Sequence, residues 1–329
     1  MARNGYIPEM RVSRGIGIIL VTLGHSEPIR SVFPLLFSVI YAFHMPLFFF
    51  LSGFFSLKDR QARSLSEWIR VTGRSLPGLI IPYICVSLLF SLLKYFVPHL
   101  AVRPVVPTRL FFDILVFPAQ NPARFLWFLY VIIILRALTP LLAAANPYFI
   151  IAALLIPQVF EPDIPLFGTS LILHYGMFYC LGMLVSTVQE QFLALLKKQW
   201  LPPAALLFFA AGYILFVKTG WFLLPLSNAL WGIIFTLSVC FCYSRFLPRK
   251  ILETAGTYSF SLYLLQYFFI FPVYLLLARS ISLPGPWIVP CTFAAGLAGP
   301  LFMIFYVFPH SRVLSLLLSG NEKMPARQQ

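Results

Sequence analysis

The sequence predicts an all-α, polytopic membrane protein with about ten transmembrane helices and cytoplasmic N- and C-termini. Of its 329 residues, 60% are hydrophobic and only 10% are charged, whereas about 25% of the residues of an average soluble domain are charged. Apolar runs recur along the whole chain, and a helical span needs roughly 20 such residues. The runs are continuous rather than alternating, which is the pattern of spanning helices and not of a transmembrane β-barrel.

The net charge of +14 suggests nucleic-acid binding at first sight. Membrane proteins, however, collect Lys and Arg in their cytoplasmic loops. With the N-terminus inside, seventeen of the 24 basic residues fall on the inner side and six on the outer side. This bias predicts that both termini are cytoplasmic and that the partner is a lipid bilayer, with no nucleic acid.

No soluble domain interrupts the predicted spans, so we expect a single membrane-embedded domain over residues 1–329. Its helical core covers about 11–311, and 312–329 is expected to be a disordered tail. The inner loop 58–75 is expected to form a basic helix at the membrane interface. Because the fifth span is short and the first has a polar end, nine or eleven spans are alternatives. The predicted spans are 15–31, 32–57, 76–97, 125–142, 147–160, 168–188, 201–217, 222–244, 256–278 and 287–309.

The first span, within "SRGIGIILVTLGHSEPIR" (13–30), carries polar residues at both ends. Arg14 and His25 are eleven residues apart, so they share one helix face and lie about 16 Å apart along the axis, roughly half the hydrocarbon thickness. Glu27 and Arg30 follow at once. Lipid does not tolerate such a cluster, so we expect it to face a protein cavity or a water-filled funnel.

The second span contains "YAFHMPLFFFLSGFF" (41–55), with His44 near its middle. Pro46 cannot donate to the helical ladder, so it should kink the span and free a carbonyl group near His44. Ionisable residues inside a bilayer are functional candidates. The alternative is that His25 and His44 each only bond a neighbouring helix.

On the inner side, Arg70 and Arg74 share a helix face just before the third span. Together with Arg14 they could form a cationic mouth that binds phosphate. The alternative for any one of these arginines is a role in topology and in contacts with lipid headgroups. The five cysteines and the scattered histidines and acidic residues have no metal-ligand spacing, so no metal site is predicted.

A histidine in a cavity above a cationic mouth suits the transfer of an acyl group from coenzyme A. The nucleotide phosphates would bind the arginines, and His25 would remove the proton from an acceptor hydroxyl as it attacks the thioester. Glu27 could tune the proton affinity of this site. The main alternative is a secondary transporter, because proton-coupled carriers also place His and Glu at mid-membrane. A third class is a non-catalytic partner in a glycan assembly complex.

Several segments resemble the motifs of the acyltransferase-3 family. "RGIGIILVTLGH" (14–25) resembles its opening motif, and "FHMPLFFFLSGFF" (43–55) resembles its second-span signature, close to the fucose 4-O-acetylase type. "RVTGRSLPGLIIPY" (70–83) is similar to the Arg-rich start of its third span. "WFLY" (127–130) and "YSFSLYLLQY" (258–267) resemble later, looser signatures.

The resemblance implies a ten-span membrane enzyme of the bacterial inner membrane. Such an enzyme is an O-acyltransferase that moves an acyl group, often acetyl, from cytoplasmic acetyl-CoA or another acyl-CoA to a sugar hydroxyl of a surface or secreted polysaccharide. His25 would be catalytic, Arg14 its donor-side partner, and Arg70 and Arg74 candidates for phosphate contact. Where many members end the ninth-span motif with His, this chain has Gln266, which cannot act as an acid or a base.

Overall fold

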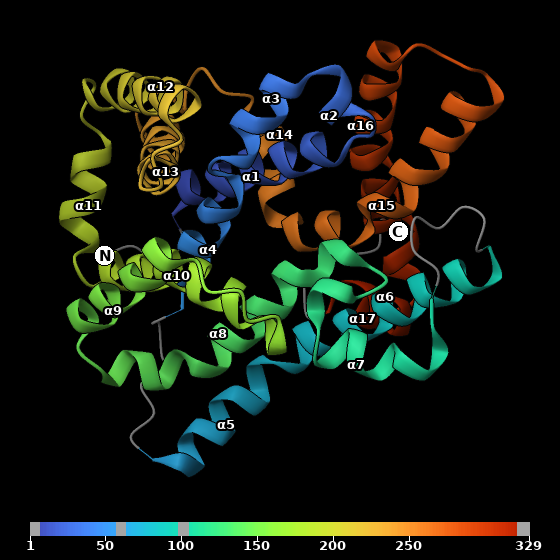
Figure 1. Ribbon diagram of the computed structural model, residues 1–329, viewed down its shortest axis with the longest axis horizontal. Coiled ribbons are helices and arrows are strands. Elements are labelled where there is room, and N and C mark those ends of the chain that lie inside the picture. The colour runs from blue at the N-terminus through green and yellow to red at the C-terminus, as the bar shows by residue number, and fades with distance from the viewer. Residues whose placement is uncertain (1–6, 57–63, 98–104, 321–329) are drawn as a thin grey trace. The chain divides into compact units, whose positions relative to one another are not determined.

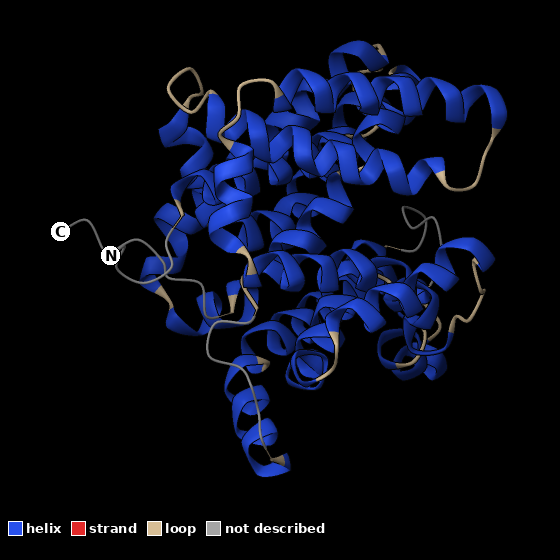
Figure 2. Cartoon of the chain, turned by 90° about the vertical axis from the view of Figure 1, so that its left-hand side faces the viewer, coloured by secondary structure: helices blue, strands red, loops and turns tan. Residues whose placement is uncertain are grey.

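The computed structural model describes residues 7–56, 64–97 and 105–320. Over these residues the chain is helical and contains no strand (Figure 2). The described chain divides into two compact units. The first contains the residues up to Leu51 together with Thr187–His310, and the second contains Ser52–Ser186 and the residues from Ser311.

In the first unit, α1 is the central helix, because it packs against α13, α14, α15 and α16 (Figure 1). Its elements are α1 (Pro8–His25), α2 (Ile29–Val32), α3 (Pro34–Tyr41), α4 (His44–Phe54, which continues into the second unit), α11 (Gln189–Leu196), α12 (Leu201–Thr219), α13 (Leu224–Cys242), α14 (Arg249–Thr257), α15 (Ser259–Leu275), the π-helix η7 (Leu276–Ser280), α16 (Gly285–Phe302), the π-helix η8 (Met303–Val307) and η9 (Phe308–His310).

The second unit is built around α6, α8 and α10, and its longest loop carries several short helices. Its elements are α5 (Leu65–Ser75), α6 (Pro77–Phe96), η3 (Pro107–Arg109), α7 (Leu110–Leu115), η4 (Pro118–Gln120), η5 (Arg124–Leu126), α8 (Trp127–Ala144), α9 (Pro147–Phe160), η6 (Leu166–Gly168), α10 (Thr169–Thr187) and α17 (Arg312–Ser319).

Eight helical segments in the described residues are long and apolar enough to cross a membrane. The first predicted span, 15–31, differs from the structure, because its helix begins at Pro8 and ends at His25. The fifth, 147–160, is a helix of 14 residues, which is shorter than a typical span. The eight segments are Pro34–Phe54, Pro77–Phe96, Arg124–Ala144, Leu166–Thr187, Leu201–Thr219, Leu224–Cys242, Ser259–Ser280 and Gly285–His310.

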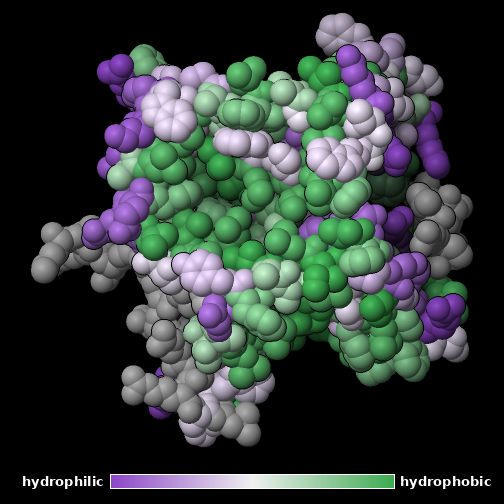
Figure 3. Space-filling view, turned by 60° about the vertical axis from the view of Figure 1, so that its left-hand side comes forward, coloured by the Kyte–Doolittle hydropathy of each residue, from purple (hydrophilic) through white to green (hydrophobic). Residues whose placement is uncertain are grey.

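Hydrophobic side chains cover much of the surface drawn in Figure 3. Many of the large ones are exposed, for example Phe96 at 74% and Val217 at 68% of their area. A soluble protein rarely leaves so much apolar surface in contact with water. These helices therefore have the outer faces expected of segments that contact lipid.

Helix α14 crosses α1 at two glycines where the backbones touch. A Cβ atom added at Gly15 would overlap the carbonyl oxygen of Leu252, and one added at Gly256 would overlap that of Arg11. Small residues permit this close approach of two helices. Leu252 and Gly256 lie on the buried face of α14.

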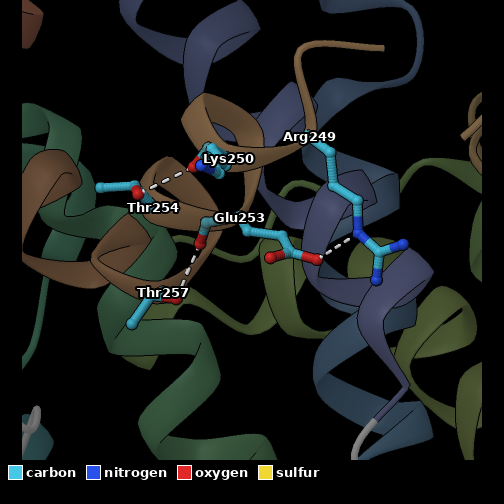
Figure 4. Close-up of polar contacts among 5 residues, drawn as sticks. All are labelled: Arg249, Lys250, Glu253, Thr254 and Thr257. Carbon is cyan, nitrogen blue, oxygen red and sulfur yellow. Dashed lines mark hydrogen bonds and ion pairs between the residues drawn. The ribbon is translucent and has the colours of Figure 1, made fainter. Parts of the chain in front are cut away.

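The other face of α14 carries the polar contacts drawn in Figure 4. Arg249 Nε donates to Glu253 Oε1 at 2.7 Å, and the Thr254 and Thr257 hydroxyls donate to backbone carbonyls one turn earlier. Such i to i+4 pairs support a short, polar helix. The segment is therefore a surface helix that packs closely against α1. This helix was not predicted from the sequence.

In the second unit, tyrosine hydroxyls hold the loop that precedes α8. The Tyr83 hydroxyl donates to the carbonyl of Ile114 at 2.5 Å, and the Tyr130 hydroxyl donates to that of Leu115 at 2.7 Å. The amide of buried Asn121 donates to Tyr83 at 3.1 Å. The described part of the proline-rich loop is thus fixed to α6 and α8.

Two predicted non-spanning segments can be compared with the structure. The interfacial segment 58–75 contains helix α5, where the Ser64 side chain caps the first turn and Trp68 Nε1 donates to the carbonyl of Ala137 at 2.8 Å; residues 57–63 lie outside the described residues. Disorder was predicted for 312–329, but Arg312–Ser319 forms helix α17; residues 321–329 lie outside the described residues. This helix packs on α6, and that contact supplies the order that the local sequence did not show.

Candidate active site

Helix α1 carries both Arg14 and His25, as predicted, and His25 is its last residue. The helix stops there because Ser26 has an extended backbone and Pro28 has no N–H to continue the ladder. A continued helix would pair the N–H of residue 28 with the carbonyl of Gly24. Instead, the Tyr41 hydroxyl donates to the Gly24 carbonyl at 3.5 Å.

The imidazole of His25 lies against two consecutive residues of α15. The rings of His25 and Tyr267 are 4.9 Å apart between centroids and tilted by 39°. The Gln266 side chain is fully buried and lies within hydrogen-bonding reach of the His25 ring. The residue His25 is half-buried, but its Nδ1 is buried and has no hydrogen-bond partner among the described residues. Buried polar atoms of proteins are normally hydrogen-bonded, so this nitrogen requires an explanation.

His44 is 1% exposed and begins α4 directly after a break in the second span. Residues 42 and 43 form a turn between α3 and α4, which agrees with the kink expected just before Pro46. His44 Nδ1 bonds the carbonyl oxygen of Ile40 at 2.7 Å. Because a carbonyl only accepts hydrogen bonds, Nδ1 carries the proton, and Nε2 of the neutral ring has the free lone pair.

The structure brings the two predicted histidines together within the first unit. Their imidazoles are close enough to interact electrostatically. Tyr41 contacts both sides of this pair: its ring meets that of His44 edge-on at 4.7 Å, and its hydroxyl reaches the carbonyl of Gly24 beside His25. The histidines therefore belong to one buried cluster.

Glu27 lies at the rim of this cluster, because its side chain is exposed. Its backbone carbonyl accepts a hydrogen bond from Thr292 Oγ1 at 2.9 Å, which ties the chain after α1 to α16. The Glu27 and Arg30 charges both act on the Tyr41 hydroxyl. The Arg30 guanidinium also lies 5.8 Å from the centre of the Phe37 ring.

The predicted cationic mouth is divided between the two units. Arg14 lies on α1, half-buried and next to the contact of Gly15 with α14. Arg70 and Arg74 are exposed residues of α5 in the second unit, so their assembly with Arg14 stays a prediction. Arg70 pairs with Glu67 at 3.6 Å and helps to line an open surface pocket of about 330 Å³.

Two features of the site were not predicted from the sequence. One is the contact of His25 with Gln266 and Tyr267, whose segment was noted for its polar residues without a partner being assigned. The other is α14, which carries Arg249 and Lys250 less than one turn before Leu252. The 3–4 residue spacing of Leu252, Ala255 and Gly256 would have indicated an amphipathic helix.

The sequence matches a known protein family over most of its length. The model of a family described as "Acyltransferase domain" matches residues 7–305, which includes every candidate site residue above. No curated protein and no solved structure matches the chain. Among the described residues, no group of three or more His, Cys, Asp or Glu side chains could hold a metal ion.

Proposed function

Because the chain belongs to the acyltransferase-3 family and is an integral membrane acyltransferase, we propose that it is a bacterial inner-membrane O-acetyltransferase. The donor is cytoplasmic acetyl-CoA or a related acyl-CoA, and the acceptor is a sugar hydroxyl of a surface or secreted polysaccharide or of its lipid-linked precursor. The observation that carries this proposal is the imidazole of His25, which lies against Gln266 and Tyr267 of α15. It stands at the end of the same helix that carries Arg14.

His25 serves as the general base in the proposed reaction. It takes the proton of the acceptor hydroxyl while the hydroxyl oxygen attacks the thioester carbonyl carbon. The carbon–sulfur bond then breaks, and the CoA sulfur leaves as a thiolate, which takes the proton from the imidazolium. The products are the acyl ester of the sugar and free CoA, so no further reactant is required.

The donor side of the site is supported by the basic residues near Arg14. A planar guanidinium binds phosphate oxygens in a bidentate manner, and Arg14 lies about 16 Å below His25 along α1. Arg249 and Lys250 are exposed on α14, which touches α1 at Gly15. These residues, with Arg70 and Arg74 of the second unit, are the groups that we expect to hold the phosphates of CoA.

The acceptor side is supported by the rim at the other end of α1. Glu27 and Arg30 are exposed and Tyr41 is 41% exposed. Carboxylate and phenol groups are suited to hydrogen bonding with the hydroxyls of a sugar. The His44 ring contacts that of Tyr41, and its Nε2 is an acceptor that could bond a group of the substrate.

The His25→Ala variant tests this proposal, and His310→Ala is the matched control because His310 is an exposed residue outside the site. Loss of a general base costs about 10²–10⁴-fold in rate. We expect His25→Ala to abolish glycan acetylation in a deletion strain, read by mass analysis, while the membrane level of the protein stays normal. His310→Ala should restore acetylation. Retained acetylation with His25→Ala would contradict the proposal.

The transporter alternative makes a different prediction for the same strain. A carrier moves its substrate into sealed vesicles without acyl-CoA, and its loss removes the polymer from the surface. Loss of the acetyl group from an otherwise intact polymer supports the enzyme instead.

A further inference from the structure

The amide group of Gln266 is oriented by its own helix. Its Nε2 donates to the carbonyl oxygen of Tyr263 at 3.2 Å. Because a carbonyl oxygen only accepts hydrogen bonds, this contact identifies the nitrogen end of the amide. The oxygen end, Oε1, is therefore the one available to a neighbouring donor.

Two buried atoms in this region lack a hydrogen-bond partner among the described residues: Oε1 of Gln266 and Nδ1 of His25. The two side chains lie within hydrogen-bonding reach of each other. An unpaired polar atom in a protein interior is costly. Oε1 is an acceptor, and Nδ1 of a neutral imidazole can carry the ring proton. The two atoms are therefore a complementary acceptor and donor in neighbouring side chains.

We propose that Gln266 is a positioning residue that accepts a hydrogen bond from Nδ1–H of His25 and thereby keeps Nε2 of that ring unprotonated. The inference rests on the proposed function, because it names Nε2 as the atom that receives the proton of the acceptor hydroxyl. A histidine with one nitrogen bound in this way has a fixed tautomer and a fixed ring orientation.

The next residue of α15 supports the same role. The Tyr267 ring lies 4.9 Å from that of His25. With the proposed hydrogen bond of Gln266, two consecutive side chains of α15 would orient the imidazole. Gln266 is neutral and gives up no proton itself. It can therefore select the tautomer of His25 without competing for the proton that is transferred.

The first test reads the tautomer directly in the resting protein. The full chain is labelled with ¹⁵N at its five histidines, and the His25 signals are assigned by their loss in His25→Ala. At a pH where the ring is neutral, we expect the Nδ1 shift of a protonated nitrogen and the Nε2 shift of an unprotonated one. The reverse pattern would overturn the proposal.

The second test compares three variants by their kinetics. Gln266→Leu removes the acceptor, and Gln266→Glu keeps an acceptor oxygen. Gln158→Leu is the control, because Gln158 is also buried, at 5% exposure, and its Nε2 donates to the carbonyl of His174 at 3.0 Å in the second unit. The control therefore loses a similar structural hydrogen bond, at a residue of the other unit that has no part in the proposed role.

For Gln266→Leu we expect kcat to fall about 10–100-fold, within the range of general-base effects, with the KM for acetyl-CoA changed by less than about 3-fold. Gln266→Glu should recover most of kcat. Its kcat pH profile should have an acidic limb at higher pH, because a carboxylate stabilises the protonated imidazole that cannot act as a base. Gln158→Leu should keep the kcat of the unmodified protein.

Equal kcat for Gln266→Leu and Gln158→Leu, per amount of folded protein, would overturn the proposal. If Gln266→Leu does not fold, the pH profile of Gln266→Glu and the His25 tautomer of the unmodified protein still test the role of Gln266. Failure of the proposed function is recognised separately, because the unmodified protein would then show no acyl transfer whatever its tautomer.

Discussion

The two histidines of the cluster lie at opposite ends of their helices and differ in how their Nδ1 atoms are bonded. His25 ends a helix and has its Nδ1 buried without a partner among the described residues. His44 begins a helix, and its Nδ1 is bound to the carbonyl of Ile40. The backbone thus fixes the tautomer of His44, whereas the tautomer of His25 depends on a side chain. A substitution of a side chain can therefore change the tautomer of His25, as the proposed role of Gln266 requires.

Arg14 is proposed to bind the phosphates of the acyl-CoA donor. Its loss should therefore affect donor binding more than acceptor binding. We expect Arg14→Ala to raise the KM for acetyl-CoA about tenfold or more, because hydrogen bonds to charged groups are worth about 1.5–3 kcal/mol. Arg14→Lys should give an intermediate KM, since Lys keeps the charge and lacks the planar fork. Steady-state kinetics with each substrate varied separately measures both effects.

Lys218→Ala is the control for that prediction, because Lys218 is an exposed cation at the end of α12. It should leave both KM values unchanged. A larger effect of Arg14→Ala on the acceptor KM than on the donor KM would show that Arg14 does not lie on the donor side.

At the level of elements, two prolines lie beside the interruptions of the helices that carry His25 and His44. Pro28 follows the end of α1 at His25, and Pro46 lacks the N–H that would bond the Ala42 carbonyl. At the first interruption the Gly24 carbonyl accepts from the Tyr41 hydroxyl, and at the second the Ile40 carbonyl bonds both Phe43 N–H and His44 Nδ1. Both interruptions therefore place backbone carbonyls where the Tyr41 and His44 side chains bond them.

The α1–α14 crossing should be sensitive to a single methyl group. We expect Gly256→Ala to destabilise the protein by about 1–3 kcal/mol, the usual range for overpacking, because its Cβ would overlap the Arg11 carbonyl. Activity should fall with it, since Arg14 is on the same stretch of α1. Thermal unfolding in detergent measures the change.

Gly73→Ala is the matched control, because nothing lies within 4 Å of a Cβ at that position of α5. Alanine is a better helix former than glycine by about 1 kcal/mol, so this variant should be as stable as the unmodified protein or slightly more so. Equal melting temperatures for the two variants would show that the close crossing is absent.

At the level of the whole molecule, the charge bias predicts on which side the donor binds. With both termini inside, the end of α1 that carries Arg14 faces the cytoplasm. We expect inside-out membrane vesicles to consume added acetyl-CoA and sealed right-side-out vesicles not to consume it, because CoA does not cross a bilayer. Release of free CoA thiol measures the reaction.

Permeabilised right-side-out vesicles provide the control, and they should regain the activity of the inside-out ones. Consumption of acetyl-CoA by sealed right-side-out vesicles would place the donor site on the outer face and would reverse the predicted topology.

Much of the fold follows from composition and spacing alone. Eight predicted spans coincide with long apolar helices, because a bilayer imposes a minimum length and excludes charge. The same arithmetic placed Arg14 and His25 on one helix, since their separation fixes their relation without any tertiary contact. The kink before Pro46 is also local, because it depends on one missing N–H.

Contacts between distant segments decided the rest. The helix of Arg312–Ser319 was expected to be disordered, because its order depends on packing against α6. A local pattern also could not predict that His25 lies near His44. Nor could it predict that Gln266, more than two hundred residues later in the chain, lies beside His25. The sequence by itself determined which residues are able to carry a proton. It also determined the positions of Arg14 and His25 along the first helix. Only the tertiary structure decided which of them meet, because hydrogen bonds and ring contacts depend on packing between helices and not on spacing along one of them.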